Sequence, residues 1–128
     1  MSSSDKRRVV VVDDDASMSQ ALERILRLGG YAPITFSSAE ALLEAGAAQR
    51  ADCLVLDIHL PGLSGFELYA RLATMGAQPP VIFMTAYDEP ETRGEANSAG
   101  AAAYFTKPFS GNDLVAAIKQ AIGTNGER

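Results

Sequence analysis

Five short apolar runs alternate with amphipathic stretches along the chain. The runs are rich in branched side chains, which pack well on a pleated sheet, and the stretches between them repeat apolar residues at helical spacing, as Leu22 and Leu26 do. The predicted strands are Arg8–Val12, Ala32–Phe36, Cys53–Leu56, Val81–Met84 and Ala102–Thr106. Strands that alternate with helices predict an α/β fold, a doubly wound parallel sheet of five strands with helices on both faces.

Serines paired with acids mark where several helices should begin. In a capping box, a serine and an acid three residues later satisfy each other's backbone N–H groups. The candidate pairs are Ser37 with Glu40, Ser64 with Glu67 and, in a weaker form, Ser110 with Asp113.

Three consecutive aspartates, Asp13, Asp14 and Asp15, follow the four valines of the first predicted strand. At a separation of about 4 Å and an effective dielectric constant of about 20, each pair of carboxylates repels by about 4 kcal/mol. Asp15 is explained as the N-cap or a first-turn acid of the helix that follows. The other two need a different explanation.

Further polar residues lie at the ends of later strands. Asp57 follows the third strand, Thr85 comes at the end of the fourth, and Lys107 follows the fifth. The carboxyl ends of parallel strands meet at one edge of a sheet, where such folds bind ligands. Asp57 with Asp13 and Asp14 should therefore form a site for Mg²⁺, with Mn²⁺ as a substitute, and the cation removes their repulsion.

Such a site can carry out phosphoryl transfer. Asp57, beside a divalent ion, can attack phosphorus and become an aspartyl phosphate. The ion and the Lys107 ammonium can bind phosphoryl oxygens, and the Thr85 hydroxyl can donate a hydrogen bond to another.

The segments "LVLDIHLPGLSG", "VIFMTA" and "YFTKPF" resemble those of the receiver domain of bacterial two-component response regulators. The resemblance runs from about Arg8 to Ile122. It implies a flavodoxin-like strand order, 2-1-3-4-5. It also implies a signalling phosphoacceptor rather than an enzyme, one that takes a phosphoryl group from the phosphohistidine of a sensor histidine kinase and assists its own phosphorylation and dephosphorylation. The signal would leave through the face of helix 4, strand 5 and helix 5, to an effector domain or protein or to a second copy in a homodimer.

The resemblance assigns roles to individual residues. Asp57 is implied to be the phosphoacceptor. Asp14, Asp57 and the backbone carbonyl of His59 are implied to bind the metal directly, while Asp13 acts largely through metal-bound water. Lys107 is implied to bind the phosphoryl group.

The remaining implied roles concern switching and lifetime. The Lys107–Pro108 bond is expected to be cis. Thr85 and Tyr104 are the implied switch residues, a hydroxyl that moves toward the phosphoryl group and an aromatic side chain coupled to it. His59 and Tyr87 occupy positions that vary in the family and tune dephosphorylation, so the lifetime of the phosphorylated form stays open.

A haloacid-dehalogenase-like phosphatase is the main alternative. Asp13, Asp15 and Ser17 come close to the DxDx[TV] loop of that class, with Asp13 as nucleophile and Asp15 as acid. Against this hypothesis, no paired acidic motif follows Lys107, and Asp57 would have no role. A flavin-binding module is disfavoured because an acid cluster repels phosphate.

Composition adds limits to these interpretations. With 128 residues the chain is expected to form one domain, residues 7–122, between a disordered end at 1–6 and a flexible tail or cut linker at 123–128. A net charge of -5 argues against direct nucleic-acid binding by this domain, so DNA binding would require a further domain. The single cysteine, Cys53, is interpreted as a small core residue. Without a long apolar run or a signal-peptide core, we expect a cytoplasmic protein with no membrane partner.

The segment Asp88–Ala103 contains no large aliphatic or aromatic residue. A helix there would be held by alanine alone, and Gly94 would weaken it by about 1 kcal/mol relative to alanine. We expect low local stability, suited to a switch; the alternative is a mobile surface loop.

Overall fold

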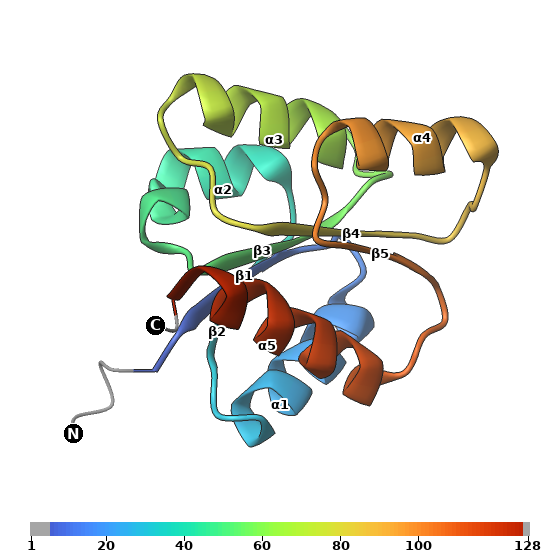
Figure 1. Ribbon diagram of the computed structural model, residues 1–128. Coiled ribbons are helices and arrows are strands. Elements are labelled where there is room, and N and C mark those ends of the chain that lie inside the picture. The colour runs from blue at the N-terminus through green and yellow to red at the C-terminus, as the bar shows by residue number, and fades with distance from the viewer. Residues whose placement is uncertain (1–5, 127–128) are drawn as a thin grey trace.

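The computed structural model, which describes residues 6–126, contains one sheet of five parallel strands (Figure 1). The strands are β1 (Arg8–Val12), β2 (Ala32–Phe36), β3 (Cys53–Asp57), β4 (Val81–Thr85) and β5 (Ala103–Thr106). Their order is β2-β1-β3-β4-β5, and every neighbouring pair is parallel. The predicted fold class and strand order are confirmed.

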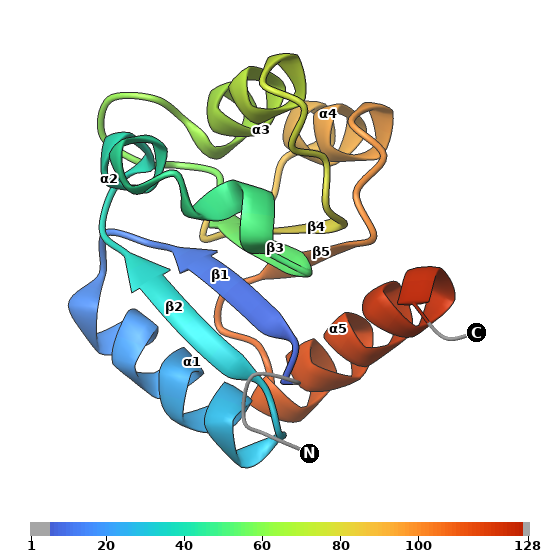
Figure 2. The ribbon, with the colours of Figure 1, turned by 90° about the vertical axis from the view of Figure 1, so that its left-hand side faces the viewer.

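Helices cover both faces of the sheet. They are α1 (Ala16–Leu28), α2 (Ala39–Ala45), α3 (Gly65–Thr74), α4 (Pro90–Ser98), α5 (Gly111–Gly126) and the short 3₁₀ helix η2 (Ala47–Arg50), which the sequence analysis did not predict. Figure 2 shows α1 and α5 on one side of the sheet and α2, α3 and α4 on the other. None of the helices between residues 6 and 126 is long and apolar enough to cross a membrane.

The β1 valines are divided between two hydrophobic cores. Val10 and Val12 join the core under α2, α3 and α4, while Val9 and Val11 join the core under α1 and α5. All four are fully buried. This is why the run is apolar without alternation: a central parallel strand is covered on both faces.

Three strand ends differ by one residue from those predicted. β3 includes Asp57 and β4 includes Thr85, whereas β5 begins at Ala103. Asp57 stays in the sheet because it pairs with Met84, whose carbonyl accepts a hydrogen bond of 2.9 Å from the Ile58 N–H. The two polar side chains are therefore held by sheet backbone rather than by loops.

The starts of α1 and α3 are as predicted. Asp15 caps α1, because its Oδ1 accepts from the N–H groups of Ser17 and Met18. The capping box of Ser64 and Glu67 is present in both directions at α3. Before α5 the weaker pair is half formed, since Ser110 Oγ accepts from the backbone N–H groups of Asn112 and Asp113.

The predicted capping box at α2 is wrong. Ser38, not Ser37, is the N-cap, and its hydroxyl oxygen accepts from the Ala41 N–H at 3.1 Å. Glu40 instead accepts a hydrogen bond of 3.1 Å from the N–H of Leu63, in the loop between β3 and α3. Glu40 thus ties α2 to that loop.

The weak segment does form a helix. α4 buries Thr92 and Ala96, so a threonine shares the role that was expected of alanine alone.

At the other end of the chain, α5 continues to Gly126, past the boundary predicted at Ile122. Residues 1–5 and 127–128, where chain ends were expected to be flexible, lie outside the described residues.

Candidate functional site

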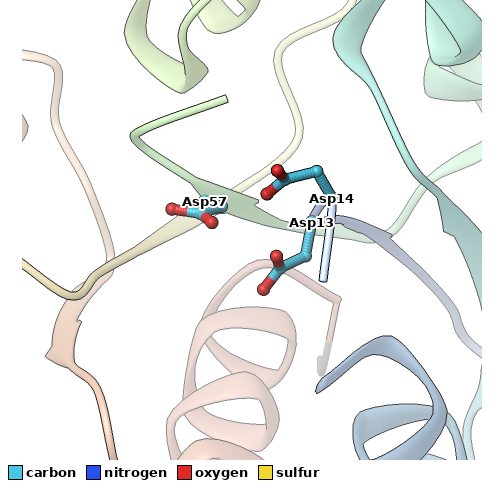
Figure 3. A group of neighbouring side chains, drawn as sticks. All are labelled: Asp13, Asp14 and Asp57. Carbon is cyan, nitrogen blue, oxygen red and sulfur yellow. The ribbon is translucent and has the colours of Figure 1, made fainter. Parts of the chain in front are cut away.

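The predicted acid cluster is present at the carboxyl edge of the sheet. Asp13 directly follows β1 and Asp57 is the last residue of β3, and Figure 3 shows both beside Asp14. One carboxylate oxygen from each of the three lies within 4.8 Å of the others. Asp13 is 1% exposed and Asp57 5%, whereas Asp14 is exposed. Two of the acids are thus held in the interior and the third faces solvent.

Lys107, which follows β5, joins the two buried acids. Its Nζ donates hydrogen bonds to Oδ2 of Asp13, at 2.9 Å, and to Oδ2 of Asp57, at 3.1 Å. Burial alone would lower the pKa of Lys107, but these two bonds outweigh it and the pKa is raised. The ammonium therefore stays charged between the carboxylates.

The remaining oxygen of each buried acid accepts from backbone. Oδ1 of Asp13 accepts from the Asp15 N–H at 2.9 Å, and Oδ1 of Asp57 accepts from the His59 N–H at 3.1 Å. These bonds fix both carboxylates in orientation. Even so, burial raises the pKa of Asp57 above its usual value, and Asp13 adds to this, against the lowering effect of Lys107.

The donor set fits a hard divalent cation. Three carboxylates within reach of one another supply oxygen ligands and more negative charge than one lysine balances. Magnesium takes one or two carboxylates with waters and phosphate oxygens, and Mn²⁺ accepts the same donors. The carboxylates of Asp13, Asp14 and Asp57 therefore form a candidate metal centre.

Thr85 is fully buried, and its hydroxyl is engaged with the loop after β4. Its Oγ1 accepts from the Tyr87 N–H at 2.9 Å and donates to the Tyr87 carbonyl at 3.3 Å. Tyr104, from β5, donates its phenolic hydrogen to Oδ1 of Asp88 at 3.0 Å. The two predicted switch residues thus both contact the loop between β4 and α4.

The loops around Asp57 hold contacts that the sequence analysis did not foresee. The rings of His59 and Tyr87 meet edge to face, with centroids 5.2 Å apart. A Cβ atom on Gly65 would overlap the backbone carbonyl oxygen of Asp57, so α3 begins against the backbone of β3. The sequence signal for this approach was the glycine directly after the α3 N-cap.

Two smaller predictions are also met. The Lys107–Pro108 peptide bond is cis. Cys53 is fully buried, and burial with the nearby Asp52 raises its pKa to about 12. A thiol with so high a pKa is not a reactive nucleophile, which agrees with its interpretation as a core residue.

Proteins of similar fold and sequence are response regulators. Solved structures of similar fold include the response regulator StyR, with a TM-score of 0.86 and 38% identity over 96% of this chain and 62% of that one. A response regulator receiver protein from Burkholderia phymatum has a TM-score of 0.80 and 42% identity over 92% of this chain and 96% of that one. The model of the response regulator receiver domain matches residues 9–119. The chain belongs to that family.

Curated relatives are longer than this chain. The response regulator protein TmoT of Ectopseudomonas mendocina is 37% identical over 89% of this chain and 52% of its own length. The transcriptional regulatory protein FixJ of Azorhizobium caulinodans is 36% identical over 94% of this chain and 57% of its own length. The chain spans about half the length of these curated relatives.

The phosphatase hypothesis gains no support. The matches are to receiver domains, and Asp15, which would have been the acid, caps α1 with its side chain. Asp57, which that hypothesis left without a role, lies in the site and contacts Lys107.

Proposed function

We propose that Asp57 is the phosphoacceptor and that a sensor histidine kinase is the donor. The observation that carries this proposal is the position of Asp57: it ends a central strand, within reach of two other acids and bonded to Lys107. A carboxylate oxygen of Asp57 forms a bond to phosphorus as the bond from phosphorus to the donor imidazole breaks, and the imidazole nitrogen keeps the electron pair.

The other residues of the site stabilise the transferred group. Lys107 is near enough to exchange its contact with Asp57 for one with a phosphoryl oxygen. Magnesium, held by Asp13, Asp14 and Asp57 with the backbone carbonyl of His59, would neutralise charge on the phosphoryl oxygens. The Thr85 hydroxyl, once released from Tyr87, would donate a hydrogen bond to a third oxygen.

The same arrangement would assist loss of the phosphoryl group to water. Water would attack phosphorus, and the bond from phosphorus to the Asp57 oxygen would break. His59 and Tyr87, whose rings meet beside the site, occupy positions that we expect to control the lifetime. The contribution of Tyr87 is measured by removing the donor and following the loss of phosphoryl mass in wild type and in Tyr87→Ala.

The signal would pass through α4, β5 and α5 to an effector, either a further domain or protein or a second copy of this chain. Relatives named as transcriptional regulators, such as FixJ and NtrC of Escherichia coli, are longer than this chain and support a role in transcription.

The proposal is tested by intact-mass measurement after incubation with magnesium and acetyl phosphate. Wild type should gain one phosphoryl group, and Asp57→Asn should gain none. Asp113→Asn, which changes an exposed aspartate in the first turn of α5, is the matched control and should be labelled like wild type. Labelling that persists in Asp57→Asn would overturn the assignment.

A further inference from the structure

Three side chains from three segments contact one another at α4 and β5, on the face through which we propose that the signal leaves. Asp88 comes from the loop between β4 and α4, Arg93 from α4 and Tyr104 from β5. Nη2 of Arg93 donates to Oδ2 of Asp88 at 2.6 Å, and the Tyr104 hydroxyl donates to Oδ1 of the same carboxylate at 3.0 Å. The Arg93 guanidinium carbon lies 4.8 Å from the centre of the Tyr104 ring. We call Asp88, Arg93 and Tyr104 the clasp.

The clasp is a network of mutual contacts rather than an isolated surface ion pair. Asp88 and Arg93 are 34% and 59% exposed, and such pairs are individually weak. Here each member contacts both others, and the arginine adds a cation–π contact to its ion pair. The hydrogen bond from Arg93 lowers the pKa of Asp88, which agrees with a carboxylate kept charged in this position.

The clasp adds a polar connection between α4 and the sheet. α4 buries only Thr92 and Ala96, its N-cap Glu89 makes no side-chain capping bond, and a Cβ atom on Gly94 would meet nothing within 4 Å. Few apolar contacts therefore hold this helix in place. The contacts of Arg93 with Asp88 and Tyr104 join α4 to the β4–α4 loop and to β5.

The same loop holds the Thr85 hydroxyl. Tyr87, which bonds Thr85 Oγ1 through both its N–H and its carbonyl, is the residue before Asp88. To donate to a phosphoryl group on Asp57, the Thr85 hydroxyl must leave the Tyr87 carbonyl. The loop loses that contact. As long as the clasp is intact, however, Asp88, the residue after Tyr87, stays bonded to Arg93 of α4 and Tyr104 of β5.

We propose that Asp88 and Arg93 are positioning residues that hold the β4–α4 loop in the arrangement seen here and so oppose the phosphorylated arrangement. This inference rests on the proposed function, because it concerns the same site. The clasp stabilises one state only, so opening it shifts the population toward the other.

The test measures binding of magnesium with beryllofluoride, a phosphoryl mimic, by calorimetry. Arg93→Ala and Asp88→Asn should each bind the mimic about threefold to fivefold more tightly than wild type, the range expected for loss of a surface ion pair from the unbound state. Acetyl phosphate should also label both variants faster. A purely structural role would leave affinity unchanged or weaken it.

Two further comparisons isolate the clasp. Glu23→Gln breaks the exposed Arg27–Glu23 pair of α1, whose contact is 2.8 Å, and should leave affinity for the mimic unchanged. In Tyr104→Phe the Asp88 carboxylate has no phenolic hydroxyl from which to accept a hydrogen bond. Adding Asp88→Asn to this variant should therefore increase the affinity for the mimic less than Asp88→Asn does in wild type.

The two ways of failing are distinguishable. If wild type binds the mimic and both clasp variants bind it equally well or more weakly, the clasp has no such role while the proposed function stands. If wild type itself binds no beryllofluoride with magnesium, both the proposed function and the role of the clasp are overturned.

Discussion

Lys107 donates a hydrogen bond of 3.1 Å to Asp57, and this bond joins the ends of β5 and β3 across β4, which lies between them in the sheet. The same ammonium contacts Asp13 beyond β1 at 2.9 Å. One cation therefore connects three strand ends. Its position explains how two carboxylates are tolerated in the interior.

Replacing Lys107 with methionine should destabilise the metal-free protein. Asp13 and Asp57 would remain buried beside each other without their cation, and breaking a buried ion pair costs about 3 kcal/mol. Urea unfolding in EDTA measures the loss, and magnesium should restore part of it by supplying positive charge. Lys119→Met, on the exposed side of α5, is the control; equal stability of the Lys107 and Lys119 variants would contradict the prediction.

Asp14→Asn should have the opposite effect on the metal-free protein. Asp14 is exposed and adds repulsion to the cluster, so removing its charge should stabilise the protein by about 1 kcal/mol. Magnesium should bind more weakly, as calorimetry can measure. Asp13→Asn should not stabilise in this way, because it also removes the ion pair with Lys107. Unchanged magnesium affinity in Asp14→Asn would remove this residue from the metal site.

Gly65→Ala should disturb the phosphoacceptor through its backbone. The new methyl group would overlap the carbonyl oxygen of Asp57, and neither β3 nor the start of α3 can yield without moving the site. We expect a loss of at least about 2 kcal/mol in the free energy of unfolding and slower labelling by acetyl phosphate. Wild-type stability and labelling rate in this variant would show that the two backbones separate freely.

Gly94→Ala should stabilise the protein. Nothing lies within 4 Å of the added methyl group, and the residue is inside α4, so the change removes backbone freedom from the unfolded chain for a gain of about 0.5–1 kcal/mol. Amide exchange in Asp88–Ala103 should be faster than in α1 in wild type, and should slow in this variant. Exchange as slow as that of α1 in wild type would show that α4 is not weakly held.

Alkaline pH should destabilise the protein through Cys53. Its pKa is raised from 9.0 to about 12, chiefly by burial, so the folded state keeps the proton where the unfolded state releases it. The contribution of Cys53 to the free energy of unfolding is complete below pH 9. It is lost as the pH rises from 9 toward 12, at up to about 1.4 kcal/mol per pH unit. Urea unfolding at pH 8 and pH 10 should show a larger fall in wild type than in Cys53→Ala. An equal fall in both would mean that the thiol titrates normally.

The position of the site could be predicted because it depends on topology alone. Asp13, Asp57 and Lys107 come together since each ends or follows a parallel strand, and such ends share one edge of a sheet. No side-chain packing had to be known. Helix starts were predicted less well where the sequence offers adjacent candidates, as at Ser37 and Ser38, where a shift of one residue changes the cap and frees Glu40 for another contact.

The clasp could not be predicted, for a physical reason. Asp88 and Arg93 are five residues apart across a helix start, so no regular helical spacing brings them together, and Tyr104 reaches the same carboxylate only through the pairing of β4 with β5. Contacts of this kind depend on the path of one loop, on which hydrophobic patterning has no influence.

The valine run of β1 has a consequence for how the chain finds its alignment. Sliding the strand by one position would exchange valine for valine at most core positions, so the run itself hardly distinguishes one alignment from the next. The charged residues at its two ends make the distinction. Arg8, whose backbone N–H bonds to Asp52 at 2.7 Å, would be drawn inward by one slip, and Asp13 would be drawn from Lys107 into the sheet by the opposite one. Asp13, one of the acids that repel one another at the site, therefore also opposes a slip of β1 in one direction, as Arg8 does in the other.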